Sequence, residues 1–329
     1  MKGRSMAKAL DVQNLVATFR IEKKEYQVLR DISFSVSQGE TLCMVGESGC
    51  GKSVTTLAVM DLLPLNGKVV SGSIMLDGKE LTTLNRKERN GVRGRQMGMI
   101  FQEPMTALNP LLTIGYQLTE GLRLHLGAGK REAEELAVSY LTRVGISNPR
   151  ERMRQFPFQL SGGLRQRVMI AMVLSLKPNL LIADEPTTAL DVTIQKQVLQ
   201  LLKSLKKEIS AGILFITHDL GVVAEIADRV IILYSGKKVE EGPVGEIFNN
   251  PLHPYTIGLL SAVPNVDNDT FQIKAIGGTI PNLTENIPGC RFSPRCTHAM
   301  PRCSAEVPRE MEMASGHFVC CHWVEEGKA

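Results

Sequence analysis

The sequence predicts an α/β fold built around a parallel sheet, and three observations carry that prediction. Four short apolar runs have the length and composition of strands that are buried on both faces. They are TLCMV (41–45), LLIAD (180–184), ILFIT (213–217) and RVIILY (229–234). Between such runs, apolar residues recur at helical spacing, as over 133–144 and 192–209. A glycine-rich loop directly follows the first run.

Composition excludes several classes of protein. Hydrophobic residues make up 43% and charged residues 22%, as in ordinary globular proteins. The 38 basic and 34 acidic residues leave a net charge of only +4, so no basic excess indicates nucleic-acid binding. The longest apolar stretch, 168–176, is about half of the ~20 residues that a membrane span needs. The start is basic without an apolar signal-peptide core, so we expect a cytosolic chain that begins at Met1 or Met6.

The chain is expected to have two parts. Residues from about 103 to 175 carry few strand signals and are predicted to form a helical insertion. After Val239 the composition shifts towards Pro, Gly and Asn, and we place a domain boundary near residue 250. Residues 251–329 are then a small appended domain that holds five of the seven cysteines.

The glycine-rich loop fits the pattern G-x-x-x-x-G-K-[ST], which is typical of phosphate binding. Its residues are Gly46, Glu47, Ser48, Gly49, Cys50, Gly51, Lys52 and Ser53. An apolar strand precedes the loop and a helix over 54–63 is predicted to follow it, which is the context that the pattern requires. Main-chain N–H groups would surround the phosphate oxygens, Lys52 would reach the β- and γ-phosphates, and Ser53 would bind Mg²⁺. The alternative is a glycine-rich turn that only joins a strand to a helix.

Two further features complement this loop. Asp184 ends a buried strand, where a carboxylate commonly holds Mg²⁺, and Glu185 is a candidate general base for an attacking water. Ser161, Gly162 and Gly163 precede a helical pattern, so their N–H groups could bind an anion at a helix N-terminus. Taken alone, the serine and glycines are better explained as an ordinary helix cap.

The ordered set of motifs resembles the nucleotide-binding subunits of ATP-binding-cassette (ABC) transporters over residues 9–245. Besides the features above, the set includes FQEP with Gln102, TALD with Asp191 and ITHD with His218. The resemblance implies a P-loop NTPase with a RecA-like core, an antiparallel β subdomain and a helical subdomain at about 103–175. The cassette would occupy residues 1–250.

The resemblance also implies a role for each matching residue. Phe19 matches the aromatic residue that stacks on adenine, with Tyr26 as a rival. Residues 46–53 would bind the phosphates of ATP. Gln102 would sense Mg²⁺ and the attacking water and would couple to the membrane subunits, while His218 would contact the γ-phosphate.

The remaining matches concern Mg²⁺ and the second subunit. Asp184 would hold Mg²⁺ and Glu185 would polarise the attacking water. Residues 161–163 would contact ATP on the opposite subunit, and Asp191 would lie at the junction of the dimer. Leu164 departs from the family, in which many members carry Gln after the two glycines; this weakens the expected contact between subunits but leaves the main-chain donors.

The tail narrows the resemblance to the dipeptide, oligopeptide and nickel importers. The segments FQEPMTALNP (101–110), HPYT (253–256) and GCRFSPRC (289–296) are similar to that branch. The branch commonly ends in four cysteines, which match Cys290, Cys296, Cys303 and Cys321. Four thiolates can hold a [4Fe–4S] cluster or Zn²⁺, and the resemblance favours the cluster. The alternative is a set of free thiols that pack a small domain.

The leading function is an ATP-hydrolysing subunit of a peptide-type importer. The resemblance implies two integral membrane permease subunits, a second ABC ATPase in a heterodimer, and an extracytoplasmic solute-binding protein. The chain would lie at the cytoplasmic face of the inner membrane and bind no nucleic acid. Two alternatives remain open: a soluble ABC-class ATPase in DNA or RNA metabolism, and an iron–sulfur regulatory module with a vestigial ATPase.

Overall fold

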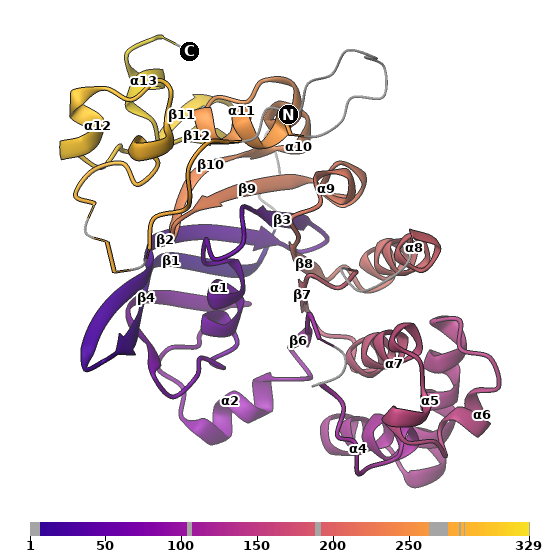
Figure 1. The fold of residues 1–329 in the computed structure, drawn as a ribbon. Coiled ribbons are helices and arrows are strands. Elements are labelled where there is room, and N and C mark those ends of the chain that lie inside the picture. Colours follow the sequence, from indigo (N-terminus) through magenta and orange to yellow (C-terminus); the bar gives the residue numbers. More distant parts are fainter. Residues whose placement is uncertain are drawn as a thin grey trace. The chain divides into compact units, whose positions relative to one another are not determined.

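The fold is described from a computed structural model, which describes residues 7–103, 107–187, 192–262, 276–282, 284–285 and 287–328. The chain divides into two compact units. Unit 1 comprises residues 1–10, 35–40 and 75–215, and unit 2 comprises residues 11–34, 41–74 and 216–329. Figure 1 shows the elements of both.

A four-stranded sheet has the order β2-β1-β4-β5. Its strands are β1 (Lys8–Ile21), β2 (Lys24–Ser37), β4 (Gly67–Leu76) and β5 (Lys79–Glu80). The turn between β1 and β2 consists of Glu22 and Lys23, whose φ angles are 47° and 68°. Two positive φ angles are typical of the tight turn that matches the twist of a hairpin.

Unit 2 contains the strand that leads into the phosphate loop. β3 (Thr41–Val45) pairs in parallel with β9 (Arg229–Tyr234), and every residue of β3 is buried. β9 pairs antiparallel with β10 (Lys237–Pro243), and β10 pairs with the C-terminal β12 (His317–Val319). β12 also pairs with β11 (Met311–Ala314), so the tail adds strands next to β10 (Figure 1).

Short helices complete unit 2. They are α1 (Lys52–Val59), α9 (Leu220–Ile226), α10 (Val244–Asn249), α11 (Pro254–Leu260), the single turn η2 (Ser293–Arg295), α12 (Pro301–Ala305) and α13 (His322–Glu325). A small apolar cluster of Val319, Cys321 and Val324, with Leu252, Met311 and Trp323 against it, packs the tail.

Unit 1 combines parallel strands with a helical bundle. β6 (Met97–Ile100) pairs in parallel with β7 (Leu180–Asp184), and β8 (Gly212–Ile216) follows later in the chain. The helices are α2 (Arg86–Val92), α4 (Ile114–Leu126), α5 (Lys130–Arg143), α6 (Pro149–Arg152), the turn η1 (Pro157–Gln159), α7 (Gly162–Ser175) and α8 (Val192–Ile209). Helix α5 packs on both α4 and α7, as Figure 1 shows.

The predicted strands coincide with β3, β7, β8 and β9 to within one residue. The helix predicted over 54–63 is instead α1, which begins at Lys52 and ends at Val59. It ends early because Asp61 has a positive φ of 52° and Pro64 follows, and neither suits a helix interior. In the described part of the chain, no helix has the length and apolar character needed to cross a membrane.

Candidate functional site

The phosphate loop of unit 2 joins β3 to α1. Its first residue must be glycine, because a Cβ on Gly46 would lie 2.3 Å from the carbonyl oxygen of Leu233. The ammonium of Lys52 donates to the carbonyl oxygens of Gly46 (2.7 Å) and Glu47 (3.0 Å), and the side chain is only 6% exposed. The loop therefore holds a buried cation directly beside main-chain atoms, as an anion-binding loop requires. Ser53 lies in the first turn of α1.

Unit 1 brings together two predicted residues that are far apart in sequence. Gln102 follows β6 and Glu185 follows β7, and these strands are parallel, with Ile100 opposite Ala183. Their carboxyl ends therefore meet at one edge. There the amide nitrogen of Gln102 donates to the carboxylate of Glu185 over 3.1 Å. Buried Asp184 is the last residue of β7.

The backbone of Glu185 is in an unfavourable conformation. Its φ is 45°, in the left-handed region that side chains other than glycine rarely adopt. Such strain is found most often at functional positions. The next residue, Pro186, accepts a hydrogen bond of 2.7 Å from the amide nitrogen of Gln166, which is 2% exposed on α7. The sequence motifs give Gln166 no role, since it stands between Arg165 and Arg167 in α7 and no local pattern distinguishes it as a buried amide.

The predicted second anion site is a capped helix N-terminus. α7 begins at Gly162, and the hydroxyl of Ser161 accepts from the N–H of Leu164 (3.4 Å). Ser161 and Gly162 are exposed and Gly163 is partly buried. The helix start therefore faces solvent, which a contact with a second subunit would require.

The other predicted nucleotide contacts have these places. Phe19 on β1 is half-buried, and its ring lies against Gly67, where an added Cβ would be 3.0 Å from it. Tyr26, the alternative residue for stacking on adenine, is also half-buried, on β2. His218 is exposed two residues after the end of β8, and the next residue caps α9. Asp191 lies outside the described residues.

The phosphate loop has two further contacts that the sequence did not reveal. The main-chain N–H of Glu47 donates to the hydroxyl of Tyr255 (2.9 Å), and its carboxylate is paired with Arg295 (2.7 Å). Both partners come from the C-terminal part of the chain. Tyr255 belongs to the segment HPYT and Arg295 to the segment FSPRC. The resemblance marks both segments but gives neither residue a chemical role.

The four matching cysteines lie near one another in unit 2. The N–H of Cys290 donates to the carbonyl oxygen of Cys303 (2.7 Å). Burial raises the pKa of the Cys290 thiol to about 11, and the neighbouring thiols of Cys303, Cys321 and Cys296 add to the rise. However, no three Cys, His, Asp or Glu side chains among the described residues are arranged to hold a metal ion. Cysteine sulfur is a suitable ligand for a metal, but the placement of these four sulfur atoms does not support the predicted [4Fe–4S] site.

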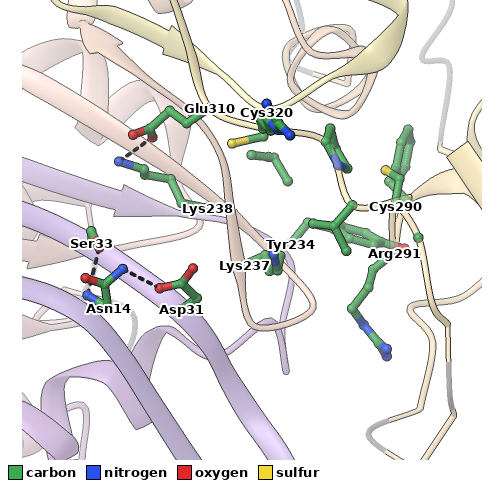
Figure 2. A pocket seen from close by; sticks show the side chains of 16 residues that line it. Asn14, Asp31, Ser33, Tyr234, Lys237, Lys238, Cys290, Arg291, Glu310 and Cys320 are labelled. Carbon is green, nitrogen blue, oxygen red and sulfur yellow. Dashed lines mark hydrogen bonds and ion pairs between the residues drawn. The ribbon is translucent and has the colours of Figure 1, made fainter. Parts of the chain in front are cut away.

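A cavity of about 400 Å³ also lies in unit 2, between the β1–β2 hairpin and the tail (Figure 2). Lys238 on its wall is paired with Glu310 (2.7 Å), and the amide of Asn14 donates to Asp31 (2.7 Å). Arg291 reaches away from the Lys238 pair and donates to the hydroxyl of Ser235 (2.7 Å). These charges already have protein partners, so we assign the cavity no ligand.

Comparison with known proteins identifies two families along the chain. The ABC transporter family matches residues 29–188, which include the phosphate loop and Glu185. The family described as the oligopeptide/dipeptide transporter C-terminal region matches residues 239–303, which include Tyr255 and Arg295.

Curated relatives match along almost the whole chain. The oligopeptide transport ATP-binding protein AppD of Bacillus subtilis is 49% identical over 98% of both chains. The dipeptide transport ATP-binding protein DppD of the same organism is 47% identical over 98% of this chain and 97% of its own. These relatives give no support to the nucleic-acid alternative.

Solved structures show the same cassette fold. The ATP-binding cassette MJ0796, in a dimeric post-hydrolysis state bound to ADP and Pi, superposes with a TM-score of 0.65 at 27% identity. The match covers 71% of this chain and 98% of that one. The chain therefore belongs to the ATP-binding subunits of ABC transporters, in the group of oligopeptide and dipeptide transport ATP-binding proteins.

Proposed function

We propose that this chain hydrolyses ATP to drive peptide import through membrane permeases. The observation that carries the proposal is the hydrogen bond from Gln102 to Glu185, because it holds a carboxylate at the end of β7, where hydrolysis needs a base. Relatives described as oligopeptide and dipeptide transport ATP-binding proteins support the solute class.

The proposal gives each site residue a defined task. Lys52 and the N–H groups of residues 46–53 other than that of Glu47, which donates to Tyr255, hold the phosphates, and Phe19 stacks on adenine. Glu185 accepts a proton from the attacking water, and the Gln102 amide keeps that carboxylate in place. Ser53, Gln102 and Asp184 would hold Mg²⁺, which neutralises charge on the phosphate oxygens. His218 contacts the γ-phosphate.

We infer a docking surface for the permeases on unit 1. The large apolar side chains exposed on unit 1 include Leu111 (83%), Phe158 (66%) and Tyr116 (53%). The N–H of Ile114 donates to the carbonyl oxygen of Gln155 (2.9 Å), so the start of α4 lies beside the segment that leads to Phe158. Exposed apolar side chains of this size favour a protein contact. The chain would thus be held at the cytoplasmic face of the inner membrane.

We also propose that a second, similar ATPase completes the transporter as a heterodimer. Residues 161–163 of one subunit would contact ATP on the other, and Asp191 would lie at their junction. The exposed start of α7 supports this arrangement. An extracytoplasmic binding protein would supply the peptide.

The test is ATP turnover by the reconstituted complex of permeases, both ATPases and binding protein. We expect peptide-loaded binding protein to raise turnover several-fold over the unloaded protein. DNA or RNA should have no effect. Stimulation by nucleic acid, with none by peptide, would overturn the proposal in favour of the nucleic-acid alternative.

We propose separately that Cys290, Cys296, Cys303 and Cys321 bind a [4Fe–4S] cluster, with Zn²⁺ as the alternative. The thiols of Cys303 and Cys321 help to raise the pKa of Cys290 and Cys296, and this proximity supports the proposal, whereas the arrangement of the four thiols does not. Iron, sulfide and zinc analysis of the anaerobically purified chain is the test. About four irons per chain are expected, lost in Cys296→Ser and kept in Cys320→Ser, since Cys320 is a cysteine of the same tail outside the four. A metal-free wild type with an intact tail would contradict it.

A further inference from the structure

The second residue of the phosphate loop carries a charge that does not suit the task of the loop. Glu47 would repel the phosphates of a nucleotide if its carboxylate faced them unpaired. Instead, the guanidinium of Arg295 neutralises it through two parallel hydrogen bonds. Nη1 lies 2.7 Å from one carboxylate oxygen and Nη2 lies 3.1 Å from the other. This two-point geometry fixes the direction of the carboxylate as well as its charge.

Arg295 is itself held in place before it reaches the loop. Its Nε donates to the carbonyl oxygen of Gly277 (2.9 Å), and Nη2 also donates to that of Ile276 (3.3 Å). The guanidinium lies 5.7 Å from the ring centre of Tyr234, and the side chain is only 4% exposed. An arginine with this many partners cannot swing away without leaving several groups unpaired.

Tyr255 holds Glu47 through the main-chain N–H of Glu47. Its hydroxyl accepts a hydrogen bond of 2.9 Å from the N–H of Glu47, so this N–H is already used within the protein. The ring is fully buried and makes edge contacts with Tyr234 (4.7 Å between centres) and tilted contacts with Phe292 (5.4 Å). Glu47 is therefore fixed at two points by the C-terminal part of unit 2.

The position of Glu47 also affects Lys52 of the phosphate loop. The carbonyl oxygen of Glu47 accepts from the ammonium of Lys52, so a shift of Glu47 would move the partner of that cation. Arg295 ends the turn η2 between two cysteines: the N–H of Ser293 donates to the carbonyl oxygen of Cys290 (3.0 Å), and Cys296 follows directly. The position of Arg295 thus depends on how the cysteine segment is folded.

We propose that Arg295 and Tyr255 are positioning residues that set the ATP affinity of the phosphate loop through Glu47. By this contact, the turn η2 of the cysteine-bearing tail affects nucleotide binding. The inference rests on the proposed function only in that the loop binds ATP.

The first test is ATP binding by the full-length chain, measured by calorimetry. Arg295→Met should weaken affinity about 5- to 10-fold, and Arg295→Lys should weaken it less because the charge remains. Tyr255→Phe should weaken it about 2- to 5-fold. The matched control is Arg291→Met, since Arg291 is also a buried arginine of the tail but bonds to Ser235 and not to the loop. Its ATP affinity should stay within about 2-fold of wild type, even where its melting temperature falls.

The second test separates action through Glu47 from general destabilisation. Glu47→Gln and Arg295→Met should not be additive, because each removes the same ion pair. In the reconstituted transporter, Arg295→Met should raise KM for ATP and leave kcat nearly unchanged. Equal affinity losses in Arg295→Met and Arg291→Met, or additive losses in the double variant, would overturn the inference alone. A wild-type chain that binds no ATP would overturn the proposed function together with it.

Discussion

The side-chain amide of Gln102 donates a hydrogen bond of 3.1 Å to the carboxylate of Glu185, a residue 83 positions further along the chain. The bond joins the ends of β6 and β7, so a substitution at either residue removes a hydrogen-bond partner of the other. Because Glu185 also has a strained backbone, with a φ of 45°, its side chain depends on such partners for its position.

Glu185→Gln should abolish ATP hydrolysis while ATP still binds. The variant keeps the size of the side chain but removes the proton acceptor, so we expect turnover to fall by at least about 100-fold. ATP affinity should stay within about 2-fold, since the phosphate loop is unchanged. Steady-state turnover and equilibrium binding check the two parts. Glu134→Gln, an exposed carboxylate on α5, is the control. Normal turnover by Glu185→Gln would show that another group is the base.

Gln102→Ala tests whether the amide positions that base. We expect kcat to fall about 10-fold, because Glu185 loses the partner that directs it, with little change in ATP affinity. In the background of Glu185→Gln, the same substitution should lower turnover less than it does in the wild type, and the loss that remains would come from the proposed Mg²⁺ contact of Gln102. A full additional loss there would mean that Gln102 acts independently of Glu185.

Gly236→Ala should destabilise the protein far more than Gly78→Ala. Both glycines lie in turns with nearly equal φ angles, +79° and +78°. A Cβ at position 236 would lie 2.0 Å from the carbonyl oxygen of Val28, whereas position 78 has open space. We expect losses of about 3 kcal/mol or more for Gly236→Ala and about 1–2 kcal/mol for Gly78→Ala, measured by urea unfolding. Equal losses would mean that the backbone angle alone sets the cost.

His253 should make the fold less stable in acid. Burial lowers its pKa to about 4, although the nearby Glu240 carboxylate acts in the opposite direction. In the unfolded chain the imidazole of His253 has its ordinary pKa and takes up a proton near pH 6.5. In the native state it takes up that proton only near pH 4. The free energy of unfolding should be fully retained above about pH 6.5 and should fall as the pH decreases to about 4, by at most about 3 kcal/mol.

The comparison variant for this effect is His253→Asn. Asparagine can still accept the N–H of Tyr255 at the start of α11, but it does not titrate. Its unfolding free energy should fall less between pH 6.5 and pH 4 than that of wild type. Parallel curves for the two proteins would show that His253 is not the group responsible.

Local patterns predicted much of this fold, because periodicity and turn chemistry act over short stretches of chain. The apolar run at 41–45 and the glycine pattern after it were enough to place β3 and the phosphate loop. The pair of Glu47 and Arg295 was not predictable, since it joins residues 248 positions apart that no local pattern connects. The same applies to the buried Glu240, which accepts from the N–H of His253 (2.8 Å) and bonds to His317 on β12 (2.8 Å).

The cysteine spacing predicted only part of the structure of the tail. It predicted that four thiols lie in one part of the fold, and the pKa values of Cys290 and Cys296, which the thiols of Cys303 and Cys321 help to raise, agree with that. Spacing does not say whether the sulfur atoms converge on one point. In the described residues they do not form a group of metal ligands.

The central claim is that ATP hydrolysis by this chain drives peptide import, and uptake into proteoliposomes tests it most directly. Vesicles would hold the two permeases and both ATPases, with ATP inside and a labelled peptide with its binding protein outside. We predict that peptide accumulates with ATP and not with ADP, and that Glu185→Gln in this chain removes most of the uptake. Accumulation that is unchanged in the Glu185→Gln vesicles, or that proceeds equally with ADP, would contradict the account.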